Sequence, residues 1–181
     1  MIYYGAKNLA ESWRTVRKNT IQVAEDIPES SYSFRAAPET MSVAEMLVHL
    51  ATGTHWAEQL HFVEKKDIVT MEGFGQYQTE AAASGAALTT KAAIVDALTS
   101  RGEAFAAQLE AMSEAALGEQ VAFAPPIPAP PKSRFEMLLG VKEHEMHHRA
   151  QLFLIERMIG IVPHLTRARQ ERMAPLAAPA R

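Results

Sequence analysis

Apolar residues recur at steps of three and four in four separate stretches of the chain, a spacing that places them on one face of an α-helix. The four stripes span residues 9–27, 46–63, 94–112 and 137–159. No stretch alternates apolar and polar residues over the length of a strand. The pattern therefore predicts an all-α fold, a bundle of four helices of about 20 residues each.

Capping residues mark where three of these helices begin. Ser42 with Glu45, and Ser133 with Glu136, each fit the S-x-x-E capping box, in which two side chains satisfy free N–H groups of the first turn. Thr90 is expected to cap the third helix in a similar way with its hydroxyl. The second, third and fourth helices are therefore predicted to start just after these residues.

Two connections differ from short turns. Residues 64–89 contain several glycines and are predicted to be irregular, but they are long enough to return along the bundle, so that the second and third helices run parallel. The paired prolines of residues 124–132, APPIPAPPK, predict a stiff, extended connector, with a docking site for a proline-recognition domain as the alternative. We expect one domain, residues 1–165, and a C-terminal tail, residues 166–181.

Composition narrows the chemistry that is available. The chain of 181 residues has no cysteine, which excludes disulfides, thiolate metal sites and a cysteine nucleophile, so any metal must be bound by histidines. A net charge of −3 with mixed signs argues against nucleic-acid binding. Lys7, Glu11 and Arg14 interrupt any signal-peptide core, and no apolar run approaches the ~20 residues of a membrane span. We expect a cytoplasmic protein that acts on a small-molecule substrate.

The stretch KEHEMHHRAQ, residues 142–151, contains His144, Glu145 and His148 in the order H-E-x-x-H, the signature of zinc metalloproteases. In that class the glutamate is the general base and a further ligand lies downstream. Here Gln151 and Leu154 stand where the extended motif has its glycine and third histidine. Because no sheet is predicted to hold a substrate peptide either, the protease is the least favoured interpretation.

The helical stripes bring a different third histidine to this pair. His144 and His148 lie one turn apart among inward-facing residues of the fourth predicted helix, and His49 lies in the stripe of the second. Three imidazoles buried without partners would cost roughly 1–3 kcal/mol each, a cost that a metal ion removes. We therefore predict a metal site of these three residues, with hydrogen-bonded core histidines as the alternative. Glu145, about 100° around the helix from His144, is expected to face solvent or form a salt bridge.

The remaining candidates are less central. His147 lies at the edge of the stripe and is expected to touch the site or a neighbouring helix. His55 and His164 are expected at the surface, and His61 lies too far along the second predicted helix to share the site. Glu45 is expected either to complete its capping box or to orient the imidazole of His49, one turn later in the helix.

The segments VHLATGTHW, residues 48–56, and HEMHHRAQL, residues 144–152, together resemble the DinB/YfiT-like superfamily. The family's usual ending is close to H-x-x-H-H-R-G-Q, and this chain carries it with Ala150 in place of the glycine. The resemblance covers about residues 5–165. It implies a four-helix bundle of up-down-down-up topology whose metal ligands are His49, His144 and His148.

The resemblance also implies zinc or nickel as the metal and a homodimer as the assembly. Relatives include transferases that use a low-molecular-weight thiol and a maleylpyruvate isomerase. Three histidines leave at least one coordination position open for water or a thiol. We therefore expect a metal-dependent enzyme that activates a thiol or water for transfer to, or hydrolysis of, a small substrate. The alternative is a non-catalytic metal-binding or sensing domain.

Overall fold

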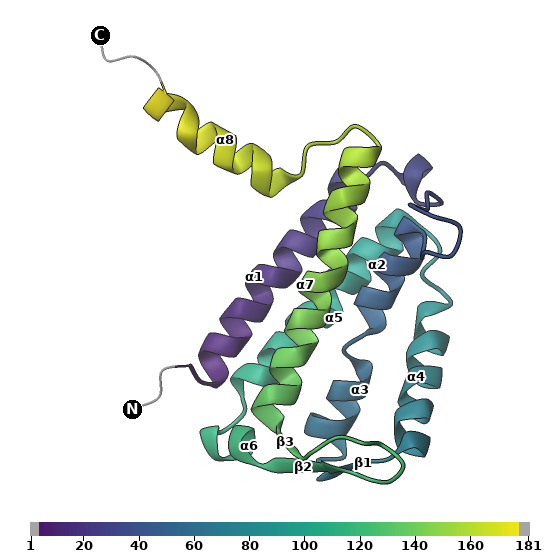
Figure 1. Ribbon diagram of the computed structural model, residues 1–181, viewed down its shortest axis with the longest axis vertical. Helices are drawn as coiled ribbons and strands as arrows, with labels where there is room; N and C mark the ends of the chain where they lie inside the picture. Colours follow the sequence, from purple (N-terminus) through teal and green to yellow (C-terminus); the bar gives the residue numbers. More distant parts are fainter. Residues whose placement is uncertain (1–3, 178–181) are drawn as a thin grey trace.

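Most of the described chain lies in helices. The computed structural model describes residues 4–177, and its long helices are α1 (Ala6–Asp26), α5 (Lys91–Glu110) and α7 (Arg134–Met158), with a shorter α2 (Val43–Thr52) packed against α5 and α7 (Figure 1). Helices α1 and α7 run in one direction and α2 and α5 in the other. The prediction of a mostly helical fold is confirmed.

The predicted stripe of α1 is buried along its whole length, and its members pack against α5 and α7. Burial of this stripe stabilises the fold at roughly 25 cal/mol per Å² of apolar surface removed from water. The buried residues of this stripe are Leu9, Trp13, Val16, Thr20, Val23 and Ile27.

The predicted helix starts are confirmed. Ser42 and Glu45 form a complete capping box on α2, and Ser133 and Glu136 form one on α7. The Thr90 hydroxyl accepts a hydrogen bond from the Ala93 N–H at 3.2 Å and caps α5. These local signals act within one turn of helix, which is why the sequence specifies them without knowledge of the packing.

The prediction of one continuous second helix is wrong beyond residue 52. Helix α2 ends at Thr52, a turn at Gly53 follows, and the chain continues through α3 (His55–Ala57) into the π-helical segment η2 (Glu58–Val63). A π-helix bonds from i to i+5, so its residues drift away from a stripe of period 3.6. Val63, predicted to face inward, is accordingly 61% exposed.

The stretch predicted to be irregular contains a helix, α4 (Met71–Gly85), which packs on the outside of α2 and α3. Thr70 caps it by accepting a hydrogen bond from the Gly73 N–H at 3.0 Å. Its buried residues are Tyr77, Ala81 and Gly85. Because two of these three are small, they produce no apolar stripe that would predict the helix.

The prediction of no strands is also wrong. Three short strands, β1 (Ile68–Val69), β2 (Gln120–Phe123) and β3 (Lys132–Ser133), form one small sheet in the order β1-β2-β3, with β2 parallel to β1 and antiparallel to β3. The proline-rich residues connect β2 to β3, after the short helix α6 (Glu114–Gly118). Strands of two to four residues are too short to show an alternating pattern.

The chain leaves the bundle after α7. Gly160 adopts a positive φ of 85°, and helix α8 (His164–Ala177) then projects away from the other helices (Figure 1). Arg167 ties its first turns to α1 through Asp26, at 2.6 Å. Residues 178–181 of the predicted tail lie outside the described residues. Within residues 4–177, no helix is long and apolar enough to cross a membrane.

Candidate metal centre

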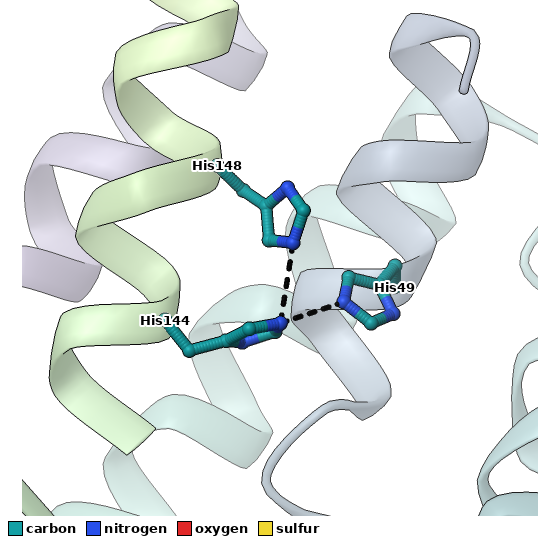
Figure 2. A group of neighbouring side chains, drawn as sticks. All are labelled: His49, His144 and His148. Carbon is teal, nitrogen blue, oxygen red and sulfur yellow. Dashed lines mark hydrogen bonds between the residues drawn. The ribbon is translucent and has the colours of Figure 1, made fainter. Parts of the chain in front are cut away.

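Three histidine side chains converge between α2 and α7 (Figure 2). His49 comes from α2, and His144 and His148 come from successive turns of α7. The Nε2 atom of His144 lies 2.9 Å from that of His49 and 3.2 Å from that of His148. The structure thus brings together the three residues that the sequence selected.

The spacing of these nitrogens suits a divalent metal ion. Histidine nitrogens bound at about 2.0–2.1 Å, with angles between those of an octahedron and a tetrahedron, lie about 2.9–3.4 Å apart. Both of the close Nε2 pairs fall in this range. The cluster is therefore compatible with a divalent metal held by three imidazoles.

Hydrogen bonding outside the cluster fixes the proton on His148. Its Nδ1 lies 2.8 Å from Oε1 of Gln151, and because a carboxamide oxygen only accepts, Nδ1 must carry the hydrogen. The Nε2 atom then presents a lone pair toward His144. A hydrogen on Nε2 of His144 can be donated to only one of its two neighbours, so at least one of these two nitrogen pairs has no hydrogen bond. A cation between the nitrogens stabilises that arrangement.

The environment of His144 and His49 favours the neutral form of these two imidazoles. Partial burial, reinforced by the other imidazoles, lowers the pKa of His144 to about 4. Burial and then the nearby His148 also lower the pKa of His49. Metal ligation requires the neutral form, so at neutral pH protons compete little with a metal ion for His144 and His49.

The expectation that these histidines are buried in the core is wrong. His144 is exposed, and His49 and His148 are half-buried. His49 and His144 border a cavity of about 260 Å³ that Trp56 of α3 and Phe74 of α4 also line. The cavity lies where α2 ends and α4 packs outside it, two features that the apolar pattern did not predict. Its position leaves His49 and His144 accessible to a small molecule.

Glu145 is turned away from the cluster. Its side chain is 2% exposed, and Oε2 lies 2.7 Å from Nη2 of Arg17 on α1, so the salt-bridge expectation is confirmed and the solvent-facing one is wrong. Burial raises the pKa of its carboxyl, and the Arg17 charge opposes that rise. Because its carboxylate is ion-paired with Arg17 and turned away from the cluster, Glu145 cannot act as the general base of an H-E-x-x-H protease.

The Arg17 side chain joins four helices. It also donates hydrogen bonds to the carbonyls of Leu50 on α2, at 3.1 Å, and Leu98 on α5, at 3.3 Å. A Cβ atom on Gly102 of α5 would lie 2.6 Å from Cγ of Arg17. Glycine is a poor helix former, so Gly102 weakens the middle of α5 but makes room for this arginine. A glycine in a helix does not by itself reveal which side chain lies beside it.

Two other predicted residues lie beside the site without joining it. His147 is exposed, and its Nε2 accepts a hydrogen bond from the Gln151 amide at 3.3 Å. Glu45 uses one oxygen in its capping box and the other on Arg35, at 2.6 Å. The capping interpretation of Glu45 is therefore confirmed.

The other histidines have separate structural roles. His55 lies 2.8 Å from Glu80 and links α3 to α4, whereas His164 contacts Asn19 at 3.1 Å, so both are less exposed than expected. His61 is buried beside Arg134, whose Nη1 donates to its Nδ1 at 3.1 Å. A larger cavity of about 560 Å³ lies beside these two residues, but the buried guanidinium of Arg134 that lines it already forms an ion pair within the chain.

The fold is mostly helical, and its three clustered histidines are compatible with one divalent ion. These two features define a class of helical proteins with a candidate metal centre. Within that class, the model of the DinB superfamily matches residues 12–152, and the chain belongs to this superfamily. Its structure is similar to the crystal structure of a DinB-like protein, YjoA, from Bacillus subtilis. The TM-score is 0.62 at 21% identity, over 84% of this chain and 91% of that chain. No curated protein matches.

Proposed function

We propose that this chain is a metal-dependent enzyme in which His49, His144 and His148 hold a divalent cation, zinc or nickel. The observation that carries the proposal is the cluster of three imidazoles, whose ligand atoms lie within 4.8 Å of one another and two of which line an open cavity. When bound at such a site, a divalent ion with a free coordination position lowers the pKa of a water or thiol ligand. The reaction is transfer of the activated thiol to a small substrate, or hydrolysis of that substrate.

The residues around the cluster have distinct parts in this proposal. Gln151 holds the proton on Nδ1 of His148 and so keeps its Nε2 available as a ligand. Trp56 and Phe74 line the cavity and shield one side of it from water. Because the chain has no cysteine, a thiol nucleophile comes from a low-molecular-weight cosubstrate.

We also propose that the frame of the site is a four-helix bundle of up-down-down-up topology. Its members are α1, the α2–α3 segment, α5 and α7, and α4 fills the long connection between the second and third. The directions of the helices in Figure 1 and the packing of α5 against both α1 and α2 support this assignment.

Metal analysis of protein purified without a nickel column tests the metal site. We expect close to one divalent ion per chain, and loss of the ion in His49→Ala and in His148→Ala. His55→Ala is the matched control, because that histidine bonds Glu80 away from the cluster, and it should retain the ion. Unchanged metal content in the first two variants would contradict the proposal.

The reaction is tested with the metal-loaded protein. A panel of electrophiles and esters, assayed with and without a low-molecular-weight thiol, separates transfer from hydrolysis. Metal binding without turnover in either assay would favour the non-catalytic sensing domain. The homodimer stays a prediction, which sedimentation velocity tests.

A further inference from the structure

The cavity beside the histidines continues into a second one. Trp56, Phe74 and Gly140 line both the cavity that includes His49 and His144 and another of about 260 Å³ that reaches Phe123 of β2. The two cavities therefore form one groove. We define the metal end as the part beside the histidines and the far end as the part beside Phe123.

The walls of the groove are largely apolar and aromatic. Helices α3 and α4 supply Trp56 and Phe74, whose rings lie edge to face with centroids 6.1 Å apart. Beyond them the far end is lined by Val69, Phe123 and Met137 from three further elements, with the charged residues Lys132 and Glu136 at its edge. Aromatic faces and edges of this kind favour a planar apolar ligand over a strongly hydrated one.

Gly140 lies where the two cavities meet, in the middle of α7 and one turn before His144. A Cβ atom built on it would meet nothing within 4 Å. Packing therefore does not require a glycine here, and glycine is among the poorest helix formers. The missing side chain instead keeps the passage between the metal end and the far end open.

We propose that this groove binds the hydrophobic body of the substrate. The substrate is a small molecule whose head group reaches the metal end and whose aromatic body extends past Gly140 toward Phe123. The assignment of the head group rests on the proposed function. The aromatic walls at Trp56 and Phe74 suit an apolar acceptor better than a multiply charged thiol such as glutathione, so we assign the groove to the acceptor substrate.

A series of hydroxamates tests this inference, because their head group binds zinc and their tails differ. The probes are acetohydroxamate, benzohydroxamate and 4-phenylbenzohydroxamate, titrated into zinc-loaded protein by calorimetry. We expect each added ring to tighten binding at least tenfold. In Gly140→Leu the gain from the rings, measured relative to acetohydroxamate on the same variant, should fall to less than threefold. Gly140→Ala is the control with a small side chain and should keep most of the gain.

The failure of the groove and the failure of the metal site give different results. Affinities that do not depend on the tail, or a Gly140→Leu variant that keeps the full gain, would overturn the groove while leaving the metal site intact. Absence of acetohydroxamate binding would count against the metal site alone. The groove is then tested in metal-free protein by 2-naphthol, which should quench Trp56 fluorescence in the wild type and not in Gly140→Leu. Lack of quenching in the wild type overturns the inference.

A second copy of the chain is the other occupant to test. If the protein dimerises and Gly140→Leu disrupts the dimer in sedimentation velocity, the groove is an interface and the substrate assignment is wrong. Dimerisation that Gly140→Leu leaves unchanged is consistent with the assignment.

Discussion

Replacement of Arg17 by methionine removes a guanidinium that lies at the junction of α1, α2, α5 and α7. Arg17 and Glu145 are 3% and 2% exposed, so neither charge is well hydrated in the folded protein. The substitution keeps an unbranched side chain of similar reach but leaves the Glu145 carboxylate buried beside an apolar group. We predict a large loss of stability from this single change.

The lost ion pair dominates the expected magnitude. Removing one partner of a buried pair costs about 3–5 kcal/mol, because the remaining charge is uncompensated. The lost hydrogen bonds to the Leu50 and Leu98 carbonyls add only about 1 kcal/mol each. For a domain of this size, the cost of the pair alone lowers Tm by roughly 6–20 °C.

A double-mutant cycle separates the pair from the packing of the arginine stem. Urea denaturation of metal-free protein would be measured for Arg17→Met, Glu145→Leu and the double variant. Replacing both members of a buried pair by apolar residues is often neutral or stabilising, so the double variant should recover most of the loss seen in Arg17→Met. A double variant whose loss equals the sum of the two single losses would refute the coupling.

Three other variants test single contacts. Gln151→Ala removes the acceptor outside the imidazole cluster and should weaken metal binding about 10–100-fold, measured by chelator competition, with little change in Tm. Burial and then Asp26 raise the pKa of Glu156 to about 7, so the fold loses stability as pH rises from about 4.5, where this carboxyl ionises in the unfolded chain, to about 7. Glu156→Gln should add up to about 3 kcal/mol at pH 8 and little at pH 5, by urea denaturation. Gly102→Ala should cost about 1–3 kcal/mol because its Cβ meets Arg17, whereas alanine at an unobstructed helical glycine would stabilise; a higher Tm would contradict this.

Features set by local chemistry could be predicted from the sequence. The caps at Ser42, Thr90 and Ser133 depend on one turn of helix, and the stripe of α1 depends on a constant period. The convergence of His49 with the α7 pair followed from two such stripes that face each other. These parts of the fold and of the site required no knowledge of tertiary contacts.

Features set by packing could not be predicted. Helix α7 packs against both α1 and α2. Glu145 lies outside the stripe of α7 that faces α2, and it is buried against α1 instead. A stripe defined against one partner does not reveal the other. The groove was not predicted for a related reason, since its wall at Phe74 belongs to α4, a helix with only three buried residues, two of them small.

The turn at Gly53 separates two tasks along a short piece of chain. His49 lies before it on α2, and Trp56 lies after it on α3, so the ligand and the wall of the groove belong to different helices. Substitutions after the turn can reshape the groove without moving the metal ligand. If the proposed metal site and groove hold, related chains that keep these histidines can differ in the molecules they accept, and a shared metal site would not imply a shared substrate.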